Sequence, residues 1–190
     1  MKKKKVVLSQ KASSKKKVTK TSLPIIKKVE GIKIMKSRTV LLVGSTVPTF
    51  SMRSTDGDVV SNASLRGKKY VLYFYPKDMT SGCTIEAHEF TELGKKFASR
   101  GILVYGVSAD SIESHHKFMK KEGISFPLLS DESHFVLGAF GVWIEKSMYG
   151  RTYMGIERST FVVDEKGIIV AIYRKVSAPG HAFCVLKDIT

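Results

Sequence analysis

The sequence predicts an α/β domain in which a mixed β-sheet carries helices on both faces. Two uninterrupted runs of β-branched and aromatic residues, at 70–75 and 102–107, are typical of strands covered on both sides. A segment with helical spacing of apolar residues follows each run. Near the C-terminus, two further apolar runs flank a turn, which indicates a hairpin added to the same sheet. The chain of 190 residues, 43% of them hydrophobic, is long enough for one such domain.

The predicted elements follow one another as strand, helix, strand, helix, hairpin and helix. Proline ends the first strand, and glycines end the first two helices, as expected from the backbone preferences of these residues. An Asp-Gly pair marks an earlier turn between two short extended stretches. The expected ranges are an entry segment at 41–50, a turn at 56–57, strands at 70–75 and 102–107, helices from 83 to 101 and from 111 to 121, hairpin strands at 160–163 and 168–173, and a last helix from about 181.

Positive charge is concentrated at the N-terminal end of the chain. Residues 1–40 contain 14 Lys or Arg and one acidic residue, a net charge of +13, whereas residues 41–190 contain 18 basic and 16 acidic residues, a net charge of +2. A segment with so many like charges and so little apolar surface is disordered in isolation. We therefore expect a disordered Lys-rich tail over 1–40 and a folded domain over 41–190.

The tail is predicted to bind nucleic acid. Contacts between lysine and phosphate release counterions, so such binding would be independent of sequence and steeply dependent on salt. The segment has no aromatic residue on which a base could stack. A nuclear import signal, attachment to an anionic membrane surface and a solubilising extension are the alternatives. The lysines concerned are Lys2, Lys3, Lys4, Lys5, Lys15, Lys16 and Lys17.

Two cysteines, Cys83 and Cys184, are too few for a disulfide scaffold and do not have zinc-site spacing. This usage indicates a reducing compartment, so we expect a cytoplasmic protein, or a nuclear or nucleoid-associated one if the tail directs it there. The first apolar run ends at Ser9, too early for a secretion signal, and no run is long enough to span a bilayer. The sequence contains no cofactor motif, and we expect neither cofactor nor metal.

The candidate site lies around Cys83, where the chain leaves a strand at Pro76 and enters a helix. A cysteine in the first helical turn faces unpaired backbone N–H groups and the positive end of the helix dipole, which favour the reactive thiolate. The hydroxyl of Thr80 could turn toward the sulfur, and Gly82 lets the backbone approach closely. Alone, Cys83 would indicate an inert buried thiol and Thr80 a helix cap. Their combination after a strand favours a nucleophile.

Pro76, Thr80 and Cys83 form the pattern P-x-x-x-T-x-x-C, which resembles the active-site signature of the peroxiredoxins. The wider run YFYPKDMTSGCTIEAHEF is similar to the bacterioferritin-comigratory-protein branch, also called the Q type. The resemblance extends from residue 41 to about 186 and implies a thioredoxin-like fold. Further blocks occur in the order of that family, at 44–50, 130–131, 141–143, 153, 155–156 and 158–161.

The resemblance implies a peroxidase that reduces hydrogen peroxide and organic hydroperoxides with electrons from a thiol. Cys83 would attack one peroxide oxygen and become a sulfenic acid. Thr80 would orient the peroxide, and Pro76 would shield the site from water. Arg158 would stabilise the thiolate and the charge that develops on the leaving oxygen. Glu86, one turn after Cys83, would either orient Arg158 or stand in solvent in the first helical turn.

Two departures from the family pattern bear on the catalytic cycle. Ser81 stands where the family usually has proline. His88 stands five residues after Cys83, where many members carry the resolving cysteine, and the helix predicted over 111–121 contains no cysteine either. Thioredoxin or another thiol would then reduce the sulfenic acid directly, in a one-cysteine cycle, unless Cys184 resolves it. We expect Cys184 to be a small apolar residue packed in the last helix.

Two other classes of function are alternatives. A non-catalytic protein could keep the peroxiredoxin scaffold and associate with nucleic acid through 1–40, but it would have no need for the complete catalytic set. A thioredoxin-like disulfide reductase normally uses C-x-x-C, and here Glu86 occupies the second cysteine position. The peroxidase is therefore the predicted function, and the protein is expected to be a monomer or a dimer.

Overall fold

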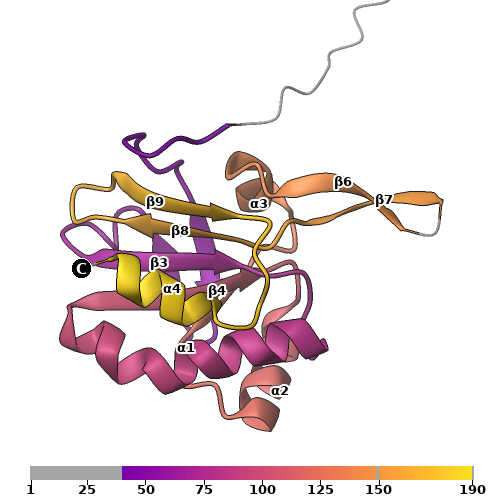
Figure 1. Cartoon of the computed structure of the whole chain (residues 1–190), viewed down its shortest axis with the longest axis horizontal. Helices are drawn as coiled ribbons and strands as arrows, with labels where there is room; N and C mark the ends of the chain where they lie inside the picture. Colours follow the sequence, from indigo (N-terminus) through magenta and orange to yellow (C-terminus); the bar gives the residue numbers. More distant parts are fainter. Residues whose placement is uncertain (1–39, 149, 190) are drawn as a thin grey trace, which may run out of the picture. The chain divides into compact units, whose positions relative to one another are not determined.

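A seven-stranded mixed sheet in the order β2-β1-β5-β4-β3-β8-β9 forms the centre of the domain (Figure 1). The structure is a computed structural model that describes residues 40–148 and 150–189. The basic tail and its lysines, predicted over 1–40 to bind nucleic acid, lie outside the described residues apart from position 40. Within the described ranges, no helix combines the length and the apolar character needed to cross a bilayer.

The described residues contain nine strands and four helices. The strands are β1 (Ser51–Ser54), β2 (Val59–Ser61), β3 (Lys69–Phe74), β4 (Ile102–Ser108), β5 (Leu128–Ser130), β6 (Trp143–Met148), β7 (Arg151–Ile156), β8 (Ser159–Val163) and β9 (Ile169–Arg174). The helices are α1 (Ser81–Ser99), α2 (Ile112–Glu122), α3 (Phe135–Ala139) and α4 (His181–Asp188).

Strand β3 lies between β4 and β8 and is buried at every position after Lys69. It pairs in parallel with β4 and antiparallel with β8. A parallel neighbour requires a crossover connection, which α1 supplies between β3 and β4, and α2 does the same between β4 and β5. The prediction of a central strand covered on both faces is confirmed.

The two faces of the sheet carry separate hydrophobic clusters. Because successive strand residues point to opposite faces, Val71 and Tyr73 pack with α1, α2 and α4, whereas Leu72 and Phe74 pack with α3 and the segment that precedes β1. Helices therefore cover both faces, as the sequence predicted.

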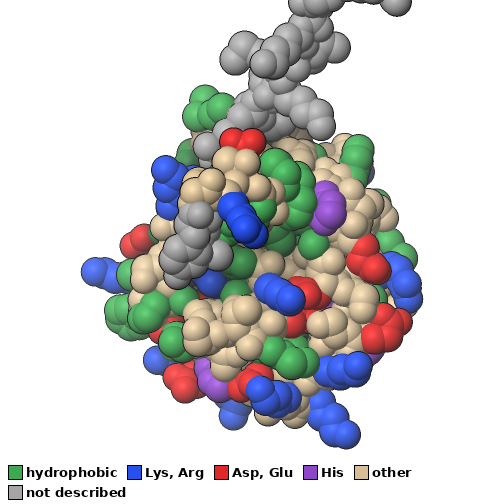
Figure 2. All heavy atoms as spheres, turned by 90° about the vertical axis from the view of Figure 1, so that its right-hand side faces the viewer, with side chains coloured by type: hydrophobic (Ala, Val, Ile, Leu, Met, Phe, Trp, Pro, Cys, Tyr) green, Lys and Arg blue, Asp and Glu red, His purple; other side chains and the backbone are tan. Residues whose placement is uncertain are grey.

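Strands β6 and β7 form a separate antiparallel hairpin that projects from the domain (Figure 1). The sequence analysis did not predict these strands, because charged and small residues interrupt their hydrophobic pattern. Tyr153 and Met154 of β7 are 46% and 48% exposed. Figure 2 views the molecule from the side on which the hairpin projects, and hydrophobic side chains there alternate with charged ones. The hairpin runs directly into β8 and so determines how the chain approaches the central sheet.

The carboxylate of Glu89 in α1 holds the N-terminus of α4. Glu89 accepts hydrogen bonds from the backbone N–H groups of Gly180 at 2.5 Å and Ala182 at 3.3 Å, which satisfies donors that a helix start leaves unpaired. His181 is buried beneath this cap, and its Nε2 lies 2.7 Å from Oγ1 of Thr160. Burial and, after it, the charge of Arg158 lower the pKa of His181 from 6.5 to about 4.

Replacing His181 is predicted to remove part of the pH dependence of stability. Its pKa is lower in the folded than in the unfolded state, so the stability it contributes is complete above about pH 6.5 and is lost as the pH falls toward 4. We expect the loss of unfolding free energy between pH 7.5 and pH 4.5, measured in urea, to be about 2–3 kcal/mol smaller in His181→Gln than in wild type. Exposed His116, changed to Gln, is the control, and an equal loss in all three proteins would contradict the assignment.

Candidate active site

Cys83 is the third residue of α1, in the first helical turn that the sequence predicted for it. Thr80 is the N-cap residue, with extended backbone at φ −87° and ψ 148°. The Cys83 residue is 1% exposed and packs with the cluster under α1. A nearly buried sulfur therefore lies beside the backbone N–H groups at the start of a helix of 19 residues.

Arg158 reaches Cys83 because β8 pairs with β3. Ser159, the first residue of β8, pairs with Phe74, the last residue of β3, so Arg158 lies beside the loop that follows β3. Its Nη2 donates a hydrogen bond to Sγ of Cys83 at 3.3 Å. A Cβ on residue 82 would lie 3.3 Å from the same nitrogen, so Gly82 leaves room for the guanidinium. Two residues 75 positions apart in the sequence thus meet in one site.

Glu86 is the second side chain in contact with this guanidinium. The alternative that it stands in solvent is wrong, because the residue is 0% exposed and its Oε2 accepts a hydrogen bond from Nη1 of Arg158. Burial raises the pKa of Glu86 to about 7, although the charge of Arg158 acts in the opposite direction. Burial alone would lower the pKa of Arg158, but Glu86 and Cys83 raise it, so the guanidinium stays charged.

Thr80 and Pro76 lie in the loop between β3 and α1, and both are exposed. The hydroxyl of Thr80 donates to the backbone oxygen of Lys77 at 3.0 Å. The expectation that it faces the sulfur is therefore not met in this arrangement, because its proton is directed back along the loop. Pro76 follows Tyr75 at the exit of the central strand, as predicted.

Cys184 and His88 are the two positions that bear on resolution of an oxidised Cys83. The expectation that Cys184 packs as a small apolar residue is wrong: it is exposed, as is its neighbour Phe183, whereas Ala182 and Val185 face the core. His88 is held against α2, with Nε2 3.1 Å from the backbone oxygen and 3.3 Å from Oε2 of Glu122.

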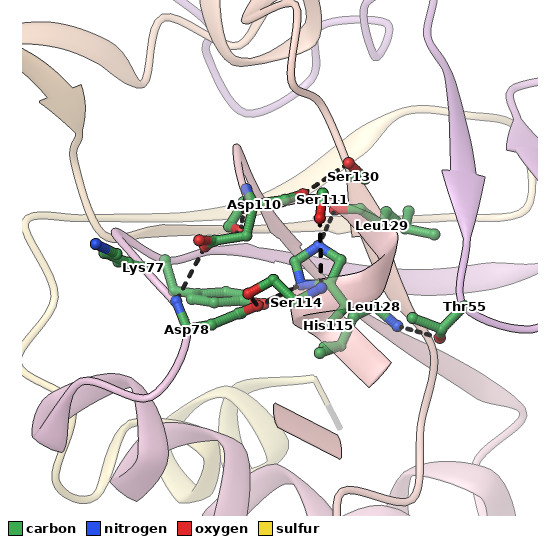
Figure 3. A network of polar contacts seen from close by, with 12 residues as sticks. Thr55, Lys77, Asp78, Asp110, Ser111, Ser114, His115, Leu128, Leu129 and Ser130 are labelled. Atoms are coloured by element: carbon green, nitrogen blue, oxygen red, sulfur yellow. Dashed lines mark hydrogen bonds and ion pairs between the residues drawn. The ribbon is translucent and has the colours of Figure 1, made fainter. Parts of the chain in front are cut away.

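A buried polar network ties the loop before α1 to α2, and sequence reasoning missed it (Figure 3). The carboxylate of Asp78 accepts hydrogen bonds from Oη of Tyr75 and Oγ of Ser114, both at 2.7 Å, and pairs with Nδ1 of His115 at 3.0 Å. The backbone N–H of Asp78 donates to Asp110, which follows β4, at 3.0 Å. The Cys83 loop is therefore held at both its backbone and its side chains.

The charge on Asp78 is stabilised within this network. Burial alone would raise the pKa of Asp78, but the hydrogen bond and charge of His115, with the hydroxyls of Ser114 and Tyr75, outweigh it and lower the pKa. The sequence signal that could have revealed the network is the helical periodicity of α2, which places His115 on the buried face and His116 on the exposed face.

The model of the AhpC/TSA family matches residues 43–172. Peroxiredoxin Bcp of Bacillus subtilis is 42% identical over 151 residues, which cover 78% of this chain and 96% of that protein. The chain belongs to the AhpC/TSA family. Its fold is that of peroxiredoxin Q from Xylella fastidiosa, with a TM-score of 0.75 at 37% identity over 80% of this chain and 96% of that one. The bacterioferritin comigratory protein of Xanthomonas campestris, in a structure concerned with alkyl peroxide reduction, gives 0.70 at 41% identity over 74% and 89%.

Membership of the AhpC/TSA family, together with likeness to the Bcp branch, identifies the activity. The chain is a peroxiredoxin, a thiol-dependent peroxidase with a thioredoxin-like fold. A hydroperoxide is its substrate and a thiol its reductant.

Removal of the Asp78 carboxylate is predicted to destabilise this peroxiredoxin strongly. Asp78→Ala leaves the donors of buried Tyr75 and His115 and of half-buried Ser114 without their acceptor, and we expect a loss of about 2–4 kcal/mol in the free energy of unfolding. Urea denaturation at pH 7.5 measures it. Asp58→Ala, at an exposed carboxylate, is the matched control, and equal stability of the two variants would contradict the role given to the network.

Proposed function

We propose that Cys83 is the nucleophile that reduces the hydroperoxide and that Arg158 supplies the charge that makes the reaction possible. The observation that carries this proposal is the 3.3 Å contact between Nη2 of Arg158 and a sulfur that is buried at the start of a helix. A thiolate at that place gains from the helix N–H groups and from the guanidinium at once.

The first step forms one S–O bond and breaks the O–O bond. The Cys83 thiolate attacks the terminal oxygen of the hydroperoxide. The electron pair of the O–O bond leaves with the other oxygen, which takes up a proton and departs as alcohol or water. Cys83 is oxidised to the sulfenic acid. Arg158 stabilises the charge on the leaving oxygen. Thr80 orients the peroxide once its hydroxyl turns from Lys77, and Pro76 limits the access of water.

An external thiol completes the cycle. A reduced thiol attacks the sulfur of the sulfenic acid and releases water, and a second thiol then restores Cys83 and leaves as the disulfide. His88 stands at the usual position of the resolving cysteine, and α2 contains no cysteine, which favours this one-cysteine cycle. Thioredoxin is the proposed reductant. Hydrogen peroxide and organic hydroperoxides are the proposed substrates, because a structure of the Xanthomonas campestris relative concerns alkyl peroxide reduction.

Turnover of hydrogen peroxide by three proteins tests the cycle, with either thioredoxin and its reductase or dithiothreitol as reductant. We expect Cys83→Ser to lose at least about 100-fold in rate, since it lacks the nucleophile. Cys184→Ser should keep full turnover with both reductants, because Cys184 takes no part in a one-cysteine cycle.

Two outcomes would contradict the proposal in different ways. If Cys184→Ser turned over only with dithiothreitol, Cys184 would be the resolving thiol and the one-cysteine cycle would be wrong. If Cys83→Ser kept the rate of wild type, Cys83 would not be the nucleophile.

A second proposed role concerns nucleic acid. The supporting observation is the net charge of +13 in residues 1–40, against +2 in the remainder of the chain. We propose that 1–40 is a Lys-rich tail, that 41–190 is the catalytic domain, and that the tail holds the peroxidase close to DNA or RNA in a reducing compartment. Binding through Lys–phosphate contacts would not depend on base sequence.

Deletion of residues 1–40 is predicted to abolish DNA binding. In gel-shift titrations at 50 mM salt, we expect the full chain to bind a random duplex and to lose about 10³-fold or more in affinity between 50 and 200 mM salt. Replacing Lys2–Lys5 and Lys15–Lys17 by Ser should reproduce most of the effect of deletion. Equal affinity of the full and truncated chains at low salt would exclude this role, and peroxide turnover of the truncated chain serves as the control for folding.

A further inference from the structure

One end of the folded domain gathers basic side chains from elements that are far apart in the sequence. It is the end at which β3 and β4 begin and α1 finishes, opposite to the end that carries Cys83, and the letter C lies beside it in Figure 1. We call this end the basal face. Its six basic residues, all of them exposed, are Arg66, Lys68, Lys69, Lys96, Arg100 and Lys166.

Contacts between separate elements hold these residues on one surface. Lys69 begins β3 opposite Ile102, so it lies beside the end of α1, where Arg100 is the C-cap residue. The backbone N–H of Gly67 donates to the backbone oxygen of Glu165 at 3.0 Å, and Nζ of Lys69 lies 3.5 Å from the carboxylate of Glu165. The loop before β3 and the turn between β8 and β9 therefore form a continuous surface with the end of α1.

The charge of the domain is concentrated at this end. Asp164 and Glu165 are the acidic residues of the β8–β9 turn, so the basal face carries six positive and two negative charges, a net charge of +4. The rest of residues 41–190 contains 12 basic and 14 acidic residues, a net charge of −2. Helix α4 ends beside Arg100 with one residue of each sign, Lys187 and Asp188, which leave this balance unchanged. An anion is therefore attracted to the basal face rather than to the domain as a whole.

A recess of about 170 Å³ lies within the basal face. Arg66 and Lys166 line it together with the polar side chain of Asn62. The carboxylate of Glu165 lines it as well, and Lys69 offsets that charge. A guanidinium presents several N–H donors in a planar fork that matches the oxygens of a phosphate. The recess thus gives a phosphate group a place between two cations.

The N-terminal segment joins the domain at the same end. The backbone N–H of Val47 donates to the oxygen of Gly167 at 2.9 Å, and that of Gly44 donates to the oxygen of Ile169 at 2.8 Å. The segment is thus paired with the residues that directly follow Lys166, and residues 1–40, with a net charge of +13, precede it in the chain. A ligand that engages both sets of cations is a long polyanion.

We propose that the basal face binds the sugar–phosphate backbone of double-stranded nucleic acid, as a contact surface separate from the tail. Its cations stand at the ends of strands and helices, which fix their positions, and a duplex presents one negative charge per about 1.7 Å of its axis. Tyr70, the aromatic residue that lines the recess, is only 2% exposed, so the recess offers neither a ring for base stacking nor an aromatic anchor for a membrane. Because Cys83 lies at the opposite end of the sheet, a bound duplex leaves the active site open.

Two triple variants of the full chain, each of which loses three positive charges, test the proposal. The basal variant carries Lys68→Gln, Lys96→Gln and Lys166→Gln. The control variant carries Lys117→Gln, Lys120→Gln and Lys121→Gln, at exposed positions of α2. Circular dichroism checks that both variants are folded, whatever their peroxidase activity. A third variant with Arg at the three basal positions keeps the charge.

Binding of a random DNA duplex is the readout. We expect the basal variant to bind at least about tenfold more weakly than wild type at about 100 mM salt, and its slope of log affinity against log salt to be smaller by about 2–3, since each phosphate contact contributes about 0.9. The control variant and the Arg variant should keep the affinity and the slope of wild type. Equal losses in the basal and control variants would overturn the proposal, because only net charge would then matter.

The same comparison in a chain whose tail lysines, at 2–5 and 15–17, are replaced by Ser separates the face from the tail. A further loss caused by the basal substitutions in this background would support the proposal. If tail replacement abolished binding and the basal substitutions had no effect in either background, the proposal would fail and the role of the tail would stand; the reverse result would support the face and refute the tail. A wild-type chain that bound no duplex at low salt would exclude both. Vesicles of phosphatidylserine and phosphatidylcholine are the last comparison, and basal substitutions that weakened vesicle binding but not DNA binding would assign the face to membranes and overturn the proposal.

Discussion

The pairing of β8 with β3 is the constraint on which the site depends. β3 delivers the loop that carries Cys83, and β8 begins opposite the last residue of β3, so the register of these two strands fixes where Arg158 enters. A shift of one residue would turn Arg158 to the other face of the sheet. The hydrophobic residues on both faces of β3 hold this register, so the packing of the core and the geometry of the catalytic contact have the same physical origin.

The guanidinium of Arg158 interacts with three groups from different parts of the chain. It stabilises a buried carboxylate, it donates to a buried sulfur, and its charge acts on His181 of α4. Burial makes each of these interactions stronger than it would be in water, and it also makes an unbalanced charge costly. The β6–β7 hairpin lies beside the segment that precedes Arg158, where Nζ of Lys146 donates a hydrogen bond to the backbone oxygen of Ile156.

The Asp78 network gives the loop its rigidity. The loop between β3 and α1 has no regular secondary structure. Asp78 nevertheless forms hydrogen bonds through its side chain to α2 and through its backbone N–H to Asp110 after β4. The position of Cys83 is therefore set from the helix side as well as from the strand side. This arrangement reduces the entropy that a reactive loop would otherwise lose when it binds a small substrate.

The sequence by itself determined the central strand, the helix that begins near Cys83, the hairpin of β8 and β9, and the peroxiredoxin motif around Cys83. These features depend on local periodicity, turn residues and spacing, which act over a few positions. Only the tertiary structure decided that Glu86 is buried against Arg158, that His115 joins Asp78, that Cys184 faces solvent and that Lys146 reaches Ile156. Each of these facts depends on contacts between residues far apart in the chain or on the face that a helix presents, and strand register and packing set both.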